Sequence, residues 1–385
     1  MVIHALNYRT GQPISVELDS GLITGLTKSS ENLPENIYIA PGLVDLQING
    51  FKGIDFNADD LNVSKVRDIC MILMERGITT FFPTIITNAS ATVERLLKVI
   101  TEACASDLEI GACIGGIHLE GPFLSAEDGP RGAHPLEHIK APNWDLFCKW
   151  QNIAQGKIKI ITLSPEWPGA YDFIKCCVNS GVIVSIGHTS ATPDQIRQAI
   201  EAGATMSTHL GNASHALLPR HANYVFEQLA SDALWSTLIA DGFHLPDALL
   251  KIFLKVKPDK SLLVSDATSY ADLPTGFYSG HIGGDVVLDK SGKLHMAGNS
   301  NMLAGSAQSL LWCVNQLVKK NLVSLPKAWN MASLKPMEAV TGITSNELQT
   351  GNRADLVLFK FESGTIKILK TIKSGKLVFS DSSQD

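Results

Sequence analysis

The 385-residue chain lacks the marks of a membrane protein and of a nucleic-acid-binding protein. Its net charge is −6 and its longest basic run is the pair Lys319-Lys320, so no basic surface for nucleic acid or anionic lipid is expected. No apolar stretch approaches the roughly 18 residues that cross a bilayer. The segment Met1–Ala5 has neither the basic nor the apolar region of a signal peptide. We therefore expect a cytoplasmic protein whose partner is a small molecule.

The cysteines show no spacing that is typical of metal or redox chemistry. There are seven of them, an odd number, and none forms a C-x-x-C pair. Such a set indicates reduced thiols in a cytoplasmic protein, and it argues against a disulfide framework, a cysteine metal site or a catalytic thiol.

Short apolar runs rich in β-branched residues alternate with amphipathic segments from about residue 39 onward, as buried parallel strands alternate with helices. Eight such runs are the number expected for a (β/α)8 TIM barrel. The predicted strands are Ile39–Asn49, Thr79–Ile85, Cys113–Gly121, Ile158–Glu166, Val182–Thr189, Thr205–Asn212, Trp235–Phe243 and Ser261–Thr268.

The predicted helices carry start and stop signals. Thr192 can cap a helix whose first residue is Pro193, and Gly77, Gly181 and Gly203 each follow a helical segment. The segments in question are Leu61–Arg76, Ala91–Ala105, Tyr171–Ser180, Pro193–Ala202 and Pro246–Val256.

The two ends of the chain show alternating apolar and polar residues, which predict antiparallel strands. We expect residues 1–37 and 345–385 to form one small β-sandwich domain beside a catalytic barrel of residues 38–344. A hairpin is predicted over Gly276–Gly298, with its turn at Asp289–Gly292. The predicted fold class is thus α/β, a TIM barrel with an accessory β-domain.

Polar residues fall at the carboxyl ends of the predicted strands, where barrels build their active sites. They are Glu120, His188, His209, His244 and Asp266. Two imidazoles and a carboxylate on neighbouring strands match the His₂Glu ligand set of a catalytic zinc site. A further carboxylate can move protons between water and a leaving amine, so the positions predict metal-assisted amide hydrolysis.

A structural role is the alternative for each of these residues alone, since a single histidine is often a hydrogen-bonded core residue. Five such residues at five strand ends favour a site over that alternative. His118 is assigned to support or pocket lining, and His215 to a loop.

The ordered motifs resemble those of the N-acetylglucosamine-6-phosphate deacetylase family of the amidohydrolase superfamily, over almost the whole chain. Pro41–Asp45 and Gly351–Val357 are similar to the paired signatures of the superfamily. The deacetylase motifs are His118–Pro122, Gly187–Thr189, Thr208–Ala213, Asp241–His244 and Asp266–Thr268.

The resemblance implies that Glu120, His188 and His209 bind a divalent metal ion. Zinc is the expected ion, with Fe²⁺ or another divalent ion also open. By the same resemblance Asp266 is the general acid/base, and His134 contacts the carbonyl of the amide that is cleaved.

The resemblance also implies how an amino sugar phosphate is bound. His244 matches the residue that contacts the sugar or its phosphate, and Asn212 and Ala213 match a pair whose backbone amides face the phosphate. Arg220 matches an arginine that reaches the phosphate in the neighbouring subunit, which implies a homodimer. A guanidinium suits that task because it forms paired hydrogen bonds with phosphate oxygens.

Three departures from the family or superfamily pattern bear on this reading. The usual H-x-H of the superfamily is replaced by Gln47-Ile48-Asn49, and because amides are poor ligands for transition metals we expect one metal ion. His221–Tyr224 stands where Glu-Pro-Gly is usual, and Gly211 replaces a larger residue.

The last two departures lie beside the expected pocket, so the hexosamine epimer and the phosphorylation of the substrate stay open. The alternative is an amidohydrolase of another N-acyl compound, such as an unphosphorylated N-acetyl sugar or an N-acyl amino acid. A catalytically inactive scaffold is disfavoured because the ligand set and the acid/base residue are all present.

Overall fold

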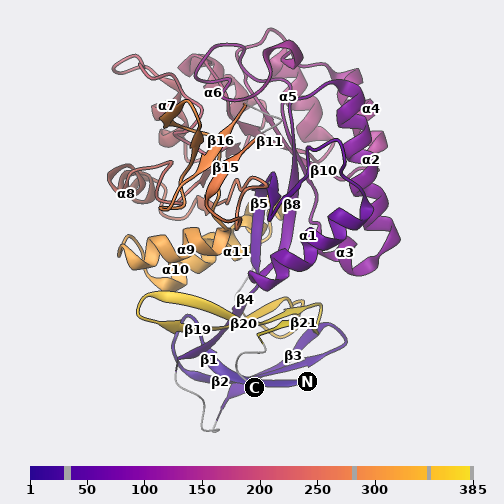
Figure 1. Ribbon diagram of the computed structural model, residues 1–385, viewed down its shortest axis with the longest axis vertical. Coiled ribbons are helices and arrows are strands. Elements are labelled where there is room, and N and C mark those ends of the chain that lie inside the picture. Colours follow the sequence, from indigo (N-terminus) through magenta and orange to yellow (C-terminus); the bar gives the residue numbers. More distant parts are fainter. Residues whose placement is uncertain (30–35, 280–283, 345–347, 382–385) are drawn as a thin grey trace.

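The computed structural model describes residues 1–29, 36–279, 284–344 and 348–381. Its larger part is a barrel of eight parallel strands whose order in the sheet follows the chain (Figure 1). A parallel bridge between Ile48 and Ala267 joins the first strand to the segment after the last. The strands are β5 (Leu43–Ile48), β8 (Ile78–Ile86), β9 (Ile117–Glu120), β10 (Ile158–Leu163), β11 (Ile183–Ile186), β12 (Met206–Ser207), β13 (Trp235–Leu238) and β14 (Ser261–Leu263).

Helices surround the barrel, as the alternating pattern predicts. The predicted cap at Thr192 is confirmed, because its side chain accepts from the amide of Gln195 in a capping box that precedes Pro193. The helices are α1 (Val63–Glu75), α2 (Ser90–Ser106), α3 (Leu108–Cys113), α4 (Trp144–Ile153), α5 (Ala170–Asn179), α6 (Pro193–Glu201), α7 (Tyr224–Ala230), α8 (Asp247–Val256), α9 (Leu310–Lys319), α10 (Leu325–Met331), α11 (Leu334–Thr341) and the 3₁₀ turn η1 (Leu136–His138).

The barrel has a separate buried cluster, formed by residues of its strands and of the segments that directly follow them. Val44, Leu46, Phe82, Ile160, Met206, Ile239, Leu262 and Val264 form this buried cluster. Met337 and Val340 of α11 pack against it. The barrel interior is therefore packed with side chains, and a site can lie only at an end of the strands.

Except for β8, the barrel strands are shorter than the apolar runs predict, and three of them end before the residues of chemical interest. β11 ends at Ile186, β12 at Ser207 and β14 at Leu263. His188, His209 and Asp266 follow in the left-handed region, with φ of 48°, 29° and 46°. Such conformations cost energy in non-glycine residues and persist where the surroundings impose them. Here they turn the chain at the strand ends.

The two ends of the chain form one mostly antiparallel seven-stranded sheet, which lies below the barrel in Figure 1. Residues from both ends share its core, including Val16, Ile23, Leu356 and Ile372. The strand order is β21-β20-β19-β4-β1-β2-β3, with β1 (Val2–Asn7), β2 (Pro13–Asp19), β3 (Leu22–Lys28), β4 (Ile37–Pro41), β19 (Leu356–Glu362), β20 (Thr365–Lys373) and β21 (Lys376–Ser380). The domain boundaries, residues 1–37 and 345–385 against 38–344, stay a prediction.

The run Ile39–Asn49, predicted as one strand, is two. β4 belongs to the terminal sheet and β5 to the barrel, and Gly42 stands between them. A Cβ on Gly42 would lie 2.1 Å from the Thr79 hydroxyl oxygen, so only glycine fits where the chain passes between the two layers.

The predicted hairpin after the eighth barrel strand is a four-stranded antiparallel sheet. It consists of β15 (Gly276–Tyr278), β16 (Val286–Leu288), β17 (Leu294–Met296) and β18 (Asn299–Leu303). The predicted turn is present between β16 and β17, where the Asp289 amide donates to the carbonyl of Lys293. A short hairpin of β6 (Gly50–Phe51) and β7 (Ile54–Asp55) follows β5.

A buried ion pair joins the terminal sheet to the barrel. Lys373 Nζ lies 2.7 Å from Asp355 Oδ2 and donates to the hydroxyl of Thr80 on β8 at 3.3 Å. Asp355 Oδ1 also accepts a hydrogen bond from the Ser374 amide, and the Asp355 backbone carbonyl accepts one from the amide of Gly42. The two signature segments of the sequence therefore meet at this joint.

We expect Lys373→Met to lower the free energy of unfolding by about 3 kcal/mol, because it leaves a largely buried carboxylate without its partner. The matched control is Lys376→Met, which removes an ion pair to Glu109 from a lysine whose side chain is 71% exposed and should change stability by less than about 1 kcal/mol. Chemical denaturation measures both. Equal effects of the two substitutions would contradict a role for the buried pair.

Candidate metal centre and active site

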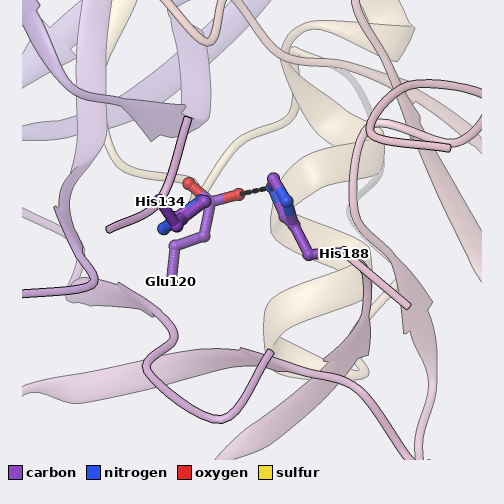
Figure 2. Close-up of side chains that lie close together, drawn as sticks. All are labelled: Glu120, His134 and His188. Carbon is purple, nitrogen blue, oxygen red and sulfur yellow. Dashed lines mark ion pairs between the residues drawn. The ribbon is translucent and has the colours of Figure 1, made fainter. Parts of the chain in front are cut away.

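Three ligating atoms converge at the carboxyl ends of β9, β11 and β12. Glu120 Oε1 lies 3.2 Å from His188 Nε2 and 3.2 Å from His209 Nε2, and the two imidazole nitrogens are 3.1 Å apart. All three residues are buried. Figure 2 shows the Glu120 carboxylate facing His188 across the site.

The size of this triangle fits a transition-metal ion. Ligand atoms about 2.0–2.1 Å from a tetrahedral zinc ion are separated by roughly 3.3 Å, close to the observed spacings. Burial raises the pKa of Glu120, but hydrogen bonds and charge from His188 and His209 outweigh it and hold that pKa well below the usual range. The carboxylate is therefore ionised and available as a ligand.

His188 is oriented by the loop that follows β9. Its Nδ1 donates to the carbonyl of Pro130 at 2.8 Å, which leaves Nε2 free to face Glu120. The same loop also holds the His188 backbone, because the Ser125 amide donates to the His188 carbonyl. Partners of this kind fix the tautomer and the orientation of a metal-binding histidine.

The two amides that replace H-x-H each hold a carboxylate. Gln47 Nε2 donates to Glu120 Oε1 at 2.9 Å, and Asn49 Nδ2 donates to Asp266 Oδ1 at 2.7 Å. An ionised carboxylate only accepts hydrogen bonds, so each amide must present its NH₂ group to it. The sequence indicated that Gln47 and Asn49 are poor metal ligands, but it did not show which side chains they donate hydrogen bonds to.

Asp266 has the properties of a group that exchanges protons near neutral pH. Burial and the nearby charge of Glu120 raise its pKa to about 6, against the opposing hydrogen bond from Asn49. A carboxylate with a pKa close to the working pH is suited to general acid/base chemistry.

His134 lies beside the Glu120 carboxylate (Figure 2), on the loop that also holds His188. Burial, with the charge of His188, lowers the pKa of His134 to about 3, so the ring is neutral. Its Nδ1 is buried, and among the described residues it has no hydrogen-bond partner. Glu120, His134 and His188 also form a possible metal cluster, with ligand atoms within 4.8 Å of one another. The triangle that includes His209 is tighter.

The remaining predicted residues lie on the loops after β12 and β13. His244 Nδ1 is paired with Asp241 Oδ2 at 2.7 Å, which orients that ring. Asn212 donates from both its backbone and its side chain to the carbonyl of His209. Ala213 has φ of 46°, and its amide makes no hydrogen bond within the described part of the chain. Arg220 is exposed.

His118 anchors a chain of buried hydrogen bonds below the site. Its Nδ1 must donate to the Leu46 carbonyl, so Nε2 of the neutral ring accepts from Thr162. Thr162 then accepts from Thr208, and Thr208 from Ser185. Burial lowers the pKa of His118 to about 4, consistent with a neutral ring. The chain links β9 to β12, which supports the assignment of His118 to structural support.

The chain matches the amidohydrolase family over residues 38–378. It is 32% identical over 354 residues to a bovine (Bos taurus) N-acetylglucosamine-6-phosphate deacetylase, covering 89% of this chain and 83% of the relative. The Bacillus subtilis protein of that name is 31% identical over 351 residues, covering 90% and 86%. This chain belongs to the N-acetylglucosamine-6-phosphate deacetylase family of amidohydrolases.

Solved structures of the N-acetylglucosamine-6-phosphate deacetylase family share the fold. The Pasteurella multocida enzyme has a TM-score of 0.86 at 28% identity and covers 98% of this chain and 99% of its own. A variant of the Mycobacterium smegmatis enzyme in complex with N-acetyl-D-glucosamine-6-phosphate has a TM-score of 0.84 at 26% identity, covering 99% of both chains. No helix among the described residues is long and apolar enough to cross a membrane. The predicted fold, a TIM barrel with an accessory β-domain, is confirmed.

The two possible ligand sets predict different metal contents for two variants. If His209 is the third ligand, His209→Ala loses the bound metal while His134→Ala keeps it. Elemental analysis of each purified protein, after removal of unbound metal, measures the metal per chain. The reverse pattern would assign the third position to His134.

Proposed function

We propose that this chain removes the acetyl group from N-acetylglucosamine-6-phosphate, or from a close N-acetylhexosamine-6-phosphate. The convergence of Glu120, His188 and His209, with Asp266 beside them, is the observation that carries the proposal. Relatives that cover most of this chain carry the deacetylase name, and one solved relative holds N-acetyl-D-glucosamine-6-phosphate.

Glu120, His188 and His209 would hold one divalent metal ion, with zinc the best match to a carboxylate and two imidazoles. Such an ion, when bound, lowers the pKa of a water ligand to about 7 and polarises a carbonyl group. Gln47 and Asn49 support the assignment of one ion, because their NH₂ groups are turned toward carboxylates. Analysis of the purified protein decides between zinc, iron and other divalent ions.

Asp266 would act as the general base and then as the general acid. Its carboxylate accepts a proton from the water that attacks the amide carbon, and the same carboxyl group then donates that proton to the amide nitrogen. The C–N bond breaks, and the products are acetate and the free amino sugar phosphate. His134, neutral and with a buried nitrogen that has no partner among the described residues, is suited to donate a hydrogen bond to the substrate carbonyl oxygen.

The phosphate would lie against the loop after β12, with His244 on the sugar. The amide of Ala213, which has no hydrogen-bond partner among the described residues, supports this placement, because backbone N–H groups bind phosphate oxygens. Arg220 would reach the phosphate of a second subunit. It lies on a segment with exposed apolar side chains, Leu217 at 90% and Phe226 at 55%, which favours a homodimer that covers this segment.

A cytoplasmic location is part of the proposal. All seven cysteines are free, as is usual in a reducing compartment. The main alternative function is hydrolysis of another N-acyl compound, which the departures at Gly211 and His221–Tyr224 keep open.

We expect the kcat/KM of the metal-loaded enzyme to fall in acid, with a midpoint no higher than about pH 6, the pKa of Asp266 without a metal. Asp266 must be ionised to accept a proton, and a bound cation would shift its titration to lower pH. Asp266→Asn should keep the metal yet lose roughly 10²- to 10⁴-fold in kcat. A pH profile and elemental analysis test both points. Full activity in that variant would remove Asp266 from the mechanism.

Acetate release separates the proposed function from its alternative. The metal-quantified protein is compared on N-acetylglucosamine-6-phosphate, N-acetylgalactosamine-6-phosphate and the two unphosphorylated sugars. Fast release from one or both phosphorylated sugars is expected. Turnover of the unphosphorylated sugars alone, or of none of the four by protein with bound metal, would move the substrate elsewhere.

Arg220→Ala should raise KM for the phosphorylated sugar by roughly 10- to 100-fold, the effect of losing hydrogen bonds to a charged group. Mixing this variant with Asp266→Asn tests action across subunits. A mixed dimer contains one site with both an intact Asp266 and an intact Arg220 from the partner, so activity with low KM should reappear. Failure of the mixture to recover would place Arg220 in its own site or outside any site.

A further inference from the structure

The segment that departs from the family pattern, His221–Tyr224, builds a helix start and a buried anchor. Asn223 caps α7 by accepting from the amides of Val225 and Phe226, and its own amide donates to the carbonyl of Pro219. Tyr224 is buried, and its hydroxyl reaches back to His215 in the preceding loop. Through its hydroxyl, Tyr224 therefore ties the start of α7 to the loop that precedes it.

Three side chains form a continuous hydrogen-bonded bridge. Tyr224 Oη accepts from the backbone amide of His215 at 2.9 Å and lies 3.0 Å from His215 Nδ1. His215 Nε2 lies 3.0 Å from Glu127 Oε2. A carboxylate only accepts, so Nε2 carries the hydrogen, and in the neutral ring Nδ1 accepts the Tyr224 hydroxyl. The neutral ring thus pairs both of its nitrogens, one with the Tyr224 hydroxyl and one with Glu127 Oε2.

The bridge connects two loops that both supply groups to the proposed site. Glu127 belongs to the loop after β9, whose Pro130 carbonyl orients His188 and which carries His134. His215 belongs to the loop after β12, which carries Asn212 and Ala213. The loops also touch directly, because a Cβ added to Gly129 would lie 3.1 Å from the carbonyl oxygen of Ser214.

We propose that Glu127, His215 and Tyr224 are positioning residues, here named the loop latch, that set the spacing between these two loops. Given the proposed function, the latch holds the amides of the phosphate-binding loop at the right distance from the carbonyl-contacting His134. Correct spacing of two binding groups strengthens the binding of a substrate that must reach both. The latch would therefore act on affinity for the phosphorylated sugar.

We expect the latch to contribute little to the free energy of unfolding. The contact between Glu127 and His215 is partly solvated, with their side chains exposed by 61% and 28%, and such exposed contacts stabilise proteins weakly. A purely structural anchor would change the melting temperature and leave KM unaltered. The latch instead predicts a change in KM with little change in kcat.

Tyr224→Phe tests this with the metal-loaded enzyme, because it removes the hydroxyl and keeps the buried ring. We expect KM for N-acetylglucosamine-6-phosphate to rise roughly 3- to 10-fold, the usual effect of one lost hydrogen bond, with kcat and metal content nearly unchanged. The matched control is Tyr8→Phe, which removes a hydroxyl that donates to Asn330 at the terminal sheet. It should leave KM unaltered.

A double-mutant cycle checks that the three residues act together. Glu127→Ala should raise KM by itself, and Tyr224→Phe should add little more in the double variant, because either change opens the same bridge. Glu137→Ala is the control, since Glu137 follows the same loop in η1, is exposed, and its side chain makes no hydrogen bond or ion pair among the described residues. Additive effects of Glu127→Ala and Tyr224→Phe would overturn the latch.

Amide hydrogen exchange tests the latch independently of the proposed function, because it needs no substrate. In Tyr224→Phe, the amides of residues 125–135 and 209–220 should exchange faster than in the unaltered protein, whatever the substrate is. Unchanged exchange in both loops, or a lower melting temperature with unchanged KM, overturns the latch. Absence of acetate release by the unaltered enzyme overturns only the proposed function.

Discussion

Glu120 carries an ionised carboxylate in an almost fully buried position, and much of the surrounding structure compensates that charge. Burying a lone carboxylate is costly unless hydrogen bonds or opposite charges accompany it. Here two imidazole nitrogens lie at 3.2 Å and the Gln47 amide donates at 2.9 Å. His188 is in turn fixed by the Pro130 carbonyl, and the hydroxyl chain from His118 runs between the strands that end at the site. A divalent cation at the centre of the three ligating atoms would complete this compensation.

Two carboxylates in the candidate site have pKa values that are shifted in opposite directions. Hydrogen bonds and charge from two histidines outweigh burial and lower the pKa of Glu120, whereas burial and the charge of Glu120 raise the pKa of Asp266 to about 6. Opposite shifts of this kind are consistent with the proposed roles, Glu120 as a metal ligand and Asp266 as the proton carrier. Gln47 and Asn49 sit on the same strand end and hold one carboxylate each. Amides there act as hydrogen-bond donors where histidines would bind a second cation.

The segment His221–Tyr224 shows how a departure from a family pattern can be read once the contacts are known. In the sequence it raises a question about the substrate, because it lies next to the arginine expected at the phosphate. In the structure Asn223 and Tyr224 start α7 and fasten the neighbouring loop through His215. These contacts are the basis for the proposal that the segment sets the spacing of two loops beside the site.

The sequence by itself determined the barrel, the pairing of the two chain ends and the strand-end positions of Glu120, His188, His209 and Asp266. It could do so because apolar periodicity reports burial, and parallel strands in a barrel bring their carboxyl ends to one face. Only the tertiary structure decided where each strand stops and which partner each polar group has. Gln47 meets Glu120 and Asn49 meets Asp266 across 73 and 217 residues of chain, and His215 meets Glu127 across 88. Such pairs depend on loop paths and side-chain rotamers, which no local pattern of residues encodes.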